Sequence, residues 1–274
     1  MSLKQNIYET FDGIKIIHVS GEVTPDFWEE VPHSHDHNEI FVHLCGELDI
    51  FVEKNLYHLS GGEIRIYRSN ELHCGKTDKK QYMEWYQISI PYSFFKTPRN
   101  KDFGRILFER EAGKENVFIS KRNHELAELL KEAESKKGEY SRHYLYCAVL
   151  KLLCIINEAD STVLDVGENP ILSKLTNAVN TNFRELSSVE ELGHMTHYST
   201  SYINKVFKRH LNITPHRFII EKKLSEAKNA LMNGLDVSEA CDAAGFNDCA
   251  NFITLFKKYF GTTPKKWAKL HSVK

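Results

Sequence analysis

The first hundred residues alternate short hydrophobic runs with turn residues, a pattern typical of β-strands. Residues 39–44 and 47–52 are rich in β-branched and aromatic side chains, and pairs such as Asp12-Gly13 and Gly61-Gly62 separate these runs. Short strands at this close spacing favour a barrel or a sandwich. We therefore expect a β domain over residues 1–120.

A helical period replaces the alternation between residues 121 and 160. Two apolar stripes flank a polar break at Gly138: Leu126, Leu129, Leu130 and Ala133, then Leu145, Ala148, Val149, Leu152, Leu153 and Ile156. Such a pair of helices can pack as a hairpin that dimerises, or it can support the β domain. The pattern alone does not separate these two roles.

Residues 161–169 are polar, and we interpret them as a linker between domains. From Pro170 to the end the pattern is helical. The predicted fold class is therefore α+β with several domains: a β-barrel with its helical hairpin, followed by an all-α domain over residues 170–274.

The all-α domain contains a weak internal repeat. Phe207-Lys208 recurs as Phe256-Lys257, and Thr214-Pro215 recurs as Thr263-Pro264, in both cases 49 residues later. A repeated supersecondary unit is the simplest explanation. Each copy predicts a helix-turn-helix unit, the first at about 188–211 and the second at about 237–260.

Residues at the expected helix ends agree with this interpretation. Gly245 lies where the second unit needs a tight turn, and Gly261 would end its second helix. Asn212 would end the corresponding helix of the first unit. Thr214-Pro215 starts a long helix that would hold the two units in a fixed relation.

Composition changes this picture in one respect. The chain has 274 residues, of which 41% are hydrophobic and 27% charged, as in folded globular proteins, and its net charge is only −1. Residues 170–274 nevertheless carry 15 Lys and Arg against 9 Asp and Glu, whereas the rest carries 21 against 28. A basic helical third on an acidic body is compatible with a nucleic-acid partner.

No apolar run is long enough to span a membrane, and the N-terminus lacks an apolar signal core, so we expect a cytoplasmic protein. None of the six cysteines forms a Cys-x-x-Cys pair, which argues against a structural zinc knuckle. Cys147 and Cys154 are seven residues apart, and we expect both to be buried in a helix seam.

The segment 245–264 looks like the signature of the AraC/XylS family of bacterial regulators. It has Gly-Phe at the turn, Phe252 and Phe256-Lys257 in the helix, and Gly261 three residues before Pro264. The match covers about the last hundred residues. One departure is Ala268, where the family commonly has arginine. The resemblance implies a DNA-binding transcriptional regulator whose partners are an operator duplex, a small-molecule effector, RNA polymerase and a second copy of the chain.

The second helix of each unit buries its apolar stripe in the domain, which leaves its polar stripe free to enter the major groove. In the first unit the groove-facing set is Thr200, Ser201, Asn204 and Lys205, with Lys208 and Arg209 placed for phosphates. By resemblance, Ser201, Asn204 and Lys205 occupy base-reading positions. The second unit offers Cys249, Ala250, Asn251, Thr254, Lys257 and Lys258. Asn and Lys pair well with base edges, so we predict that the first unit discriminates sequences better.

Histidines gather in the segment 33–39 of the β domain. A His-x-His pair on a strand points both imidazoles to one side, and the later His73 would close a hairpin. The candidate metal ligands are His33, His35, Glu39 and His73. Three imidazoles and a carboxylate would suit a divalent ion such as Zn, Ni, Mn or Fe.

This arrangement resembles the two cupin motifs over about residues 15–90, although Arg68 stands where the second motif usually has proline. Sugar-responsive members of the same regulator family carry such a domain. Three interpretations remain open: hydrogen-bonded lining without metal, a metal that helps to hold the effector, and catalysis. We rank catalysis last and expect no enzyme, because sensing is a sufficient role beside a DNA-binding domain. A required cofactor is not expected.

The effector pocket is expected to be lined by His43, Arg65, Tyr67, Trp85 and Tyr86. Aromatic groups with polar partners suit a sugar or a similar polar metabolite. The sequence does not identify the effector, the operator, or the choice between activation and repression.

Overall fold

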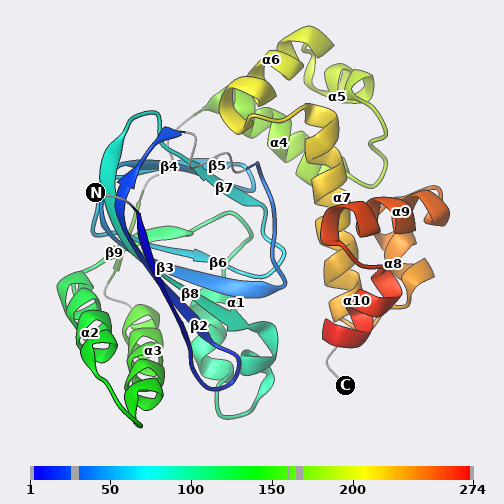
Figure 1. Ribbon diagram of the computed structural model, residues 1–274. Helices are drawn as coiled ribbons and strands as arrows, with labels where there is room; N and C mark the ends of the chain where they lie inside the picture. The colour runs from blue at the N-terminus through cyan, green and yellow to red at the C-terminus, as the bar shows by residue number, and fades with distance from the viewer. Residues whose placement is uncertain (1–2, 26–30, 159–160, 165–168, 272–274) are drawn as a thin grey trace.

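The computed structural model describes residues 3–25, 31–158, 161–164 and 169–271. The β domain consists of two sheets that face each other (Figure 1). The larger sheet has the order β1-β2-β8-β3-β6-β9-β10, with strands Lys4–Glu9, Lys15–Val23, Gln81–Pro91, His37–Cys45, Ile64–Tyr67, Val117–Ser120 and Ser161–Val163. The smaller sheet has the order β5-β4-β7, with strands Asn55–Leu59, Leu48–Val52 and His73–Lys76.

Both faces of the larger sheet are covered, because successive side chains point to opposite faces. Trp85 on β8 belongs to the core between the two sheets. Its neighbour Tyr86 belongs to the core on the other face, beneath the helical hairpin. Short helices η2 (Tyr92–Lys96), η3 (Lys101–Gly104) and α1 (Arg105–Phe108) follow β8 and add Phe94, Phe95 and Leu107 to that second core.

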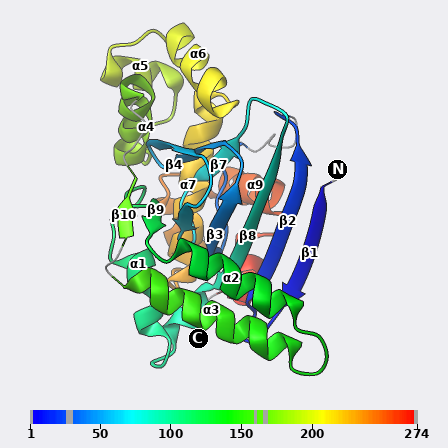
Figure 2. The ribbon, with the colours of Figure 1, turned by 90° about the vertical axis from the view of Figure 1, so that its left-hand side faces the viewer.

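Helices α2 (Asn123–Ser135) and α3 (Ser141–Asn157) form the hairpin expected from the sequence, and Figure 2 shows both lying across the larger sheet. The two predicted stripes are buried against the sheet, apart from the half-buried Leu129. The hairpin therefore supports the β domain. Cys147 and Cys154 are exposed rather than buried in a seam, because they lie on the side of α3 that faces away from the sheet.

The predicted linker 161–169 is shorter than expected. Residues Ser161–Val163 form β10, which pairs antiparallel with β9, so the β domain takes up the first part of this segment. Residues 165–168 lie outside the described part of the chain. Asn169 then caps the next helix by accepting a hydrogen bond from the Leu172 N–H.

The C-terminal domain consists of helices α4 (Pro170–Asn182), α5 (Val189–Thr196), α6 (Thr200–Leu211), α7 (Pro215–Met232), α8 (Val237–Ala243), α9 (Cys249–Phe260) and α10 (Pro264–His271). Helices α5 and α6 form the first helix-turn-helix unit, and α8 and α9 form the second. Figure 1 shows α7 connecting the two units. Within the described residues, we find no helix that is both long and apolar enough to cross a membrane.

The helix ends follow the capping rules used in the sequence analysis. The side chains of Ser199, Thr214 and Asp248 accept hydrogen bonds from the first turns of α6, α7 and α9. Asn212 and Gly261 adopt left-handed conformations at the ends of α6 and α9, with φ of 55° and 70°. These local signals explain why the predicted boundaries of both units agree with the structure.

Candidate functional site

The exposed face of α6 carries the residues expected to contact DNA. Ile203, Val206 and Phe207 are buried in the domain core, as the helical pattern predicts. The opposite face presents Ser201, Asn204, Lys205, Lys208 and Arg209, with Thr200 half-buried at its start. The basic residues of the last turn lie at the negative end of the helix dipole. A helix that enters a major groove needs one polar face free of core contacts, and this face of α6 meets that requirement.

The exposed face of α9 is less suited to reading bases. Ala250, Asn251, Thr254, Lys257 and Lys258 are exposed, while Phe252 and Phe256 are buried. The Thr254 hydroxyl donates to the Ala250 carbonyl at 2.9 Å, so its hydrogen is already used within the helix. Within this exposed set, Asn251 is the one side chain that carries an amide, the group best suited to pairing with the edge of adenine.

Cys249 differs from the expectation. It was predicted to face the groove, but it is half-buried and forms a disulfide with Cys241 on α8. Sequence spacing could not reveal this pair, since the helix-turn-helix geometry brings the two residues together.

Substituting Asn204 by alanine is expected to reduce discrimination among operator variants more than the same change at Asn251. A bidentate amide contact contributes about 1–3 kcal/mol of discrimination. In the DNA-free chain the Asn204 amide donates to the Thr200 carbonyl at 2.8 Å, and rotation of the side chain would release it for a base. Affinity for a panel of single-base variants measures the effect, and a larger loss from Asn251→Ala would contradict the prediction.

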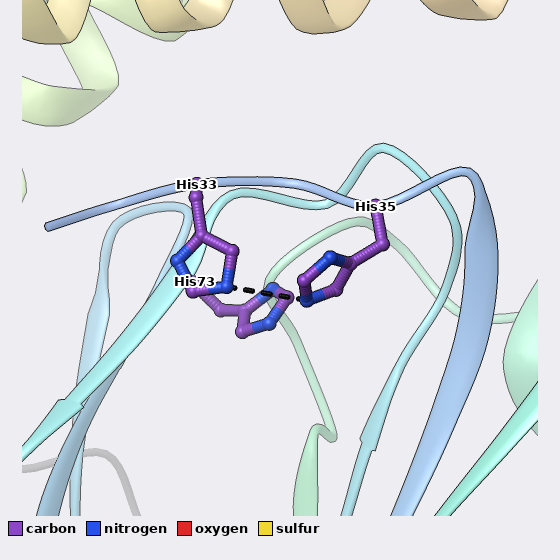
Figure 3. Close-up of side chains that lie close together, drawn as sticks. All are labelled: His33, His35 and His73. Atoms are coloured by element: carbon purple, nitrogen blue, oxygen red, sulfur yellow. Dashed lines mark hydrogen bonds between the residues drawn. The ribbon is translucent and has the colours of Figure 1, made fainter. Parts of the chain in front are cut away.

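The four predicted metal-ligand side chains meet at one end of the β domain. Figure 3 shows His33, His35 and His73 with their rings turned toward one another. The Nε2 atoms of His33 and His35 are 3.2 Å apart. Glu39 Oε2 lies 3.4 Å from Nε2 of His35 and 3.4 Å from Nε2 of His73. Ligand atoms of the three histidines lie within 4.8 Å of one another.

Backbone hydrogen bonds orient two of these imidazoles. Nδ1 of His33 donates to the Val31 carbonyl at 2.9 Å, and Nδ1 of His73 donates to the Glu71 carbonyl at 2.9 Å. In a neutral ring, a protonated Nδ1 leaves Nε2 as the lone-pair nitrogen on the side of the cluster, which is the arrangement found around bound metals. The hydrogen bond from His73 Nε2 to Glu39 belongs to the protonated ring, and a bound ion would take the place of that proton. Paired backbone bonds between His33 and His73, at 3.0 and 3.1 Å, hold the two segments together.

The charge states also suit a cation. Burial lowers the pKa of His35, and its hydrogen bond to Glu39 offsets this only in part. Burial raises the pKa of Glu39, but hydrogen bonds from His35, His37 and His73 outweigh it and bring the pKa well below its ordinary value. A neutral imidazole beside an ionised carboxylate is the form that binds a divalent ion.

Sequence reasoning missed His37, although it lies in the same segment. Burial lowers its pKa, but hydrogen bonds to Asp36 and Glu39 raise it further, to about 9. Nε2 of His37 is 3.3 Å from Glu39 Oε1, and the Gln87 amide donates to the same oxygen at 2.7 Å. These contacts orient Glu39 through its Oε1, while its Oε2 contacts His35 and His73. The two-residue spacing His33, His35, His37 was the available signal.

A cavity of about 220 Å³ lies next to the histidine cluster. Three of the five predicted effector residues, Arg65, Tyr67 and Trp85, line it together with His33, His35, Glu39 and His73. Leu3 and Gln5, from β1 and the residue before it, also contribute to the lining. The cavity is therefore small, partly aromatic and polar.

Two predicted effector residues lie elsewhere. Tyr86 points to the opposite face of the sheet, where its hydroxyl donates to Glu134 on α2 at 2.7 Å. His43 is fully buried outside the cavity lining and bonds through Nε2 to the Gly46 carbonyl at 2.8 Å. Burial, together with Arg65, lowers the pKa of His43 to about 4. Neither placement could be read from residue type alone.

Arg65 is the most informative residue of the lining. It is only 3% exposed, its guanidinium carbon lies 4.0 Å from the Phe41 ring centroid, and its buried Nε has no hydrogen-bond partner. Because this Nε is also closed to solvent, Arg65 contributes to the cavity as a cation in its wall and not through that atom. The cavity therefore favours a small ligand with exposed oxygen atoms.

Helix α7 contacts the β domain beside the histidine cluster. Lys222 forms an ion pair with Glu53 at 3.3 Å, and the other Glu53 oxygen accepts from the Leu72 N–H at 2.9 Å. Lys228 donates to the Ser34 carbonyl at 2.8 Å, between His33 and His35. The Ser225 hydroxyl donates to the Asn70 carbonyl. These contacts reach both segments that carry the histidines.

Comparison with known proteins supports a role in gene regulation. A family model described as a helix-turn-helix domain matches residues 192–270. The probable transcriptional regulator LumQ of Photobacterium leiognathi is 23% identical over 86% of this chain and 90% of that protein. The Msm operon regulatory protein of Streptococcus mutans is 21% identical over 96% and 97%. The transcriptional activator RhaR of Mannheimia succiniciproducens is 23% identical over 86% of each. These similarities extend over both domains.

Proposed function

We propose that this chain, a DNA-binding transcriptional regulator of the AraC/XylS family, is controlled by a small polar metabolite bound in the cavity of its β domain. The observation that carries the proposal is the cavity itself, which the buried cation Arg65 lines together with aromatic and polar side chains. A cavity of about 220 Å³ is below the size typical for drug-like ligands, so a metabolite of sugar size fits best. Several similar proteins are named for sugar operons, including the raffinose operon regulator of Pediococcus pentosaceus.

The histidine cluster is proposed to hold a divalent metal ion at the edge of this cavity. The ligands would be Nε2 of His33, His35 and His73 and a carboxylate oxygen of Glu39. The donor set fits because two imidazoles are oriented by backbone carbonyls and the carboxylate is ionised. When bound, the ion supplies a positive centre that polarises oxygen atoms of the metabolite. Arg65 and Gln87 would bind and orient the rest of the ligand.

Coupling to DNA is proposed to run through α7. Ligand binding would reposition the segments that carry His33, His35 and His73, and these segments share hydrogen bonds with Lys228, Ser225 and, through Glu53, with Lys222. Since α7 joins the two helix-turn-helix units, a change in its contacts alters how both engage successive major-groove segments. The α2–α3 hairpin is the proposed homodimer surface, and the cytoplasm is the proposed location.

Titration with Zn²⁺ or Ni²⁺ tests the site and the coupling together. The chain is expected to bind one equivalent of metal. The metal should also change the Kd for a labelled duplex from upstream of its own gene by about fivefold or more. His35→Ala removes one ligand and is expected to weaken metal binding about 100-fold. Loss of a residue that only orients a metal ligand already weakens binding by about 10-fold to 100-fold. Calorimetry and fluorescence anisotropy measure the two effects.

His58→Ala is the matched control, because His58 is exposed on β5, where it pairs with the exposed Asp49. It should bind metal and respond as the unchanged chain does. Equal metal binding by the His35→Ala and unchanged chains would contradict the metal site. Metal binding without any change in DNA affinity would contradict the coupling.

A further inference from the structure

The second helix-turn-helix unit contains a pair of cysteines that its DNA-binding role does not require. Cys241 on α8 and Cys249, the first residue of α9, form a disulfide with a Cα–Cα distance of 5.9 Å. This distance is common for disulfides, so the backbone of the unit accommodates the bond. The bond encloses the turn with Gly245 and the capping residue Asp248. Cys45, Cys147 and Cys154 are free thiols.

The two sulfur atoms have different environments. Cys241 is 0% exposed in the core of the second unit, whereas Cys249 is half-buried at the surface. Cys249 also lies at the N-terminal end of a 12-residue helix, where the backbone N–H groups favour a negative charge. A small oxidant from solvent can therefore reach Cys249 first, while Cys241 is placed to react second.

The unit also accommodates the reduced form. Cys241 Sγ lies 3.6 Å from the Phe246 carbonyl oxygen, so its thiol has a hydrogen-bond acceptor when the disulfide is open. Cys241 thus has a partner in both redox forms: the Cys249 sulfur when oxidised and the Phe246 carbonyl when reduced. The fold of α8 therefore does not depend on the disulfide. In a reducing compartment such as the proposed cytoplasm, a disulfide of this kind forms transiently.

We propose that Cys241 and Cys249 are an oxidation site for hydroperoxides that regulates DNA binding by the second unit; this regulation rests on the DNA-binding function proposed above. The Cys249 thiolate attacks the peroxide, whose O–O bond breaks, giving a sulfenic acid and an alkoxide or hydroxide that takes up a proton. The Cys241 thiolate then attacks the Cys249 sulfur and expels hydroxide, which is protonated to water. Two thiols and one hydrogen peroxide thereby give one disulfide and two waters.

Oxidation is expected to strengthen DNA binding. In the reduced form, the first turn of α9 is held near α8 by side-chain packing and by the turn, in which the Phe246 N–H donates to the Cys241 carbonyl at 3.1 Å. The disulfide joins the two helices directly and restricts the turn before DNA arrives. The unit then loses less conformational freedom when it binds DNA. Its affinity for DNA therefore rises about threefold to tenfold.

The test uses the full-length chain, reduced with dithiothreitol and then treated with hydrogen peroxide. Non-reducing peptide mapping is expected to show the Cys241–Cys249 disulfide before any oxidation of Cys147 or Cys154. Anisotropy with a labelled duplex from upstream of its own gene should show the oxidised form binding about threefold to tenfold more tightly. Cys241→Ser, a change in the core of the unit and not among the residues expected to contact DNA, should bind like the reduced form and show no gain of affinity with peroxide. Cys45→Ser, whose site is outside the DNA-binding domain, should respond normally.

Persistence of two thiols at positions 241 and 249 while other cysteines oxidise would overturn the proposal. So would formation of the disulfide with less than about a twofold change in Kd. If neither form bound any DNA, the DNA-binding function itself would have failed, and the peptide mapping would still decide the oxidation step. The two failures are therefore distinguishable.

Discussion

Replacing Gly245 by alanine is expected to destabilise the second helix-turn-helix unit by about 3 kcal/mol or more, and to abolish its contribution to DNA binding. Gly245 has a φ of 70°, where a residue with a Cβ costs about 1–2 kcal/mol. A Cβ at this position would also overlap the Cα and carbonyl oxygen of Arg184, which are backbone atoms that cannot rotate away. Overpacking of this kind adds about 1–3 kcal/mol.

The surroundings of Gly245 explain why the turn cannot easily shift to remove the overlap between the added Cβ and Arg184. Its carbonyl accepts from Lys223 on α7 at 2.7 Å, and the Arg184 guanidinium donates to the Ala243 carbonyl at 2.9 Å. The turn is therefore held between α7 and the segment after α4. Movement of the turn would change the angle between α8 and α9, and with it the presentation of α9 to DNA.

Gly261→Ala is the matched control. Gly261 has the same φ of 70°, but nothing lies within 4 Å of the position a Cβ would take. This variant should lose only the backbone contribution, about 1–2 kcal/mol. Urea unfolding followed by circular dichroism compares the two variants, and equal losses would show that the contact with Arg184 does not matter.

Replacing Glu71 by alanine is expected to destabilise the β domain by about 3–5 kcal/mol, because it leaves the buried Arg110 charge without its carboxylate counter-ion. Both Glu71 oxygens accept from Arg110, at 2.8 and 2.6 Å. The N–H groups of Gly113 and Arg68 donate to the same carboxylate at 2.7 and 3.0 Å. The backbone carbonyl of residue 71 orients His73, and the carboxylate of Glu71 holds this segment in place, so the variant should also weaken metal binding by loosening the segment.

The effect of Glu71 depends on pH. Burial raises its pKa, but the hydrogen bonds and charge of Arg110 lower it more, so the folded pKa lies below the ordinary value. Stability from the ionised carboxylate is therefore present above the ordinary carboxyl pKa and is lost as pH falls through the lowered folded pKa. Glu71→Gln cannot ionise at this position. The difference in the free energy of unfolding between the unchanged chain and this variant should therefore become smaller as the pH falls through the lowered pKa.

Glu111→Ala is the control for Glu71, because Glu111 is exposed and pairs with Lys54 and Lys114 at the surface. Exposed pairs contribute about 0–1 kcal/mol, so little stability should be lost. Urea unfolding at neutral and acidic pH measures both variants. A loss from Glu71→Ala no larger than that from Glu111→Ala would refute the role of the buried pair.

The sequence alone determined the local features of this protein. Periodicity located both helix-turn-helix units, and capping residues such as Ser199, Asp248 and Gly261 marked their helix ends, because these signals act over a few residues. The face of α6 that carries Asn204 and Lys205 followed from burial of Ile203 and Phe207. The sequence also indicated that His33, His35, Glu39 and His73 lie together, because the His-x-His spacing and a returning hairpin bring them to one place, while metal binding by these residues stays a prediction.

Only the tertiary structure decided which distant elements meet. It placed Tyr86 beneath the hairpin and His43 outside the cavity, because residue type does not indicate which face of a strand is hollow. It brought Cys241 to Cys249, Arg184 to Gly245 and Lys222 to Glu53. These contacts depend on the angles at which helices and sheets pack. Those angles are set by the complete packed interior and by no single segment of the chain.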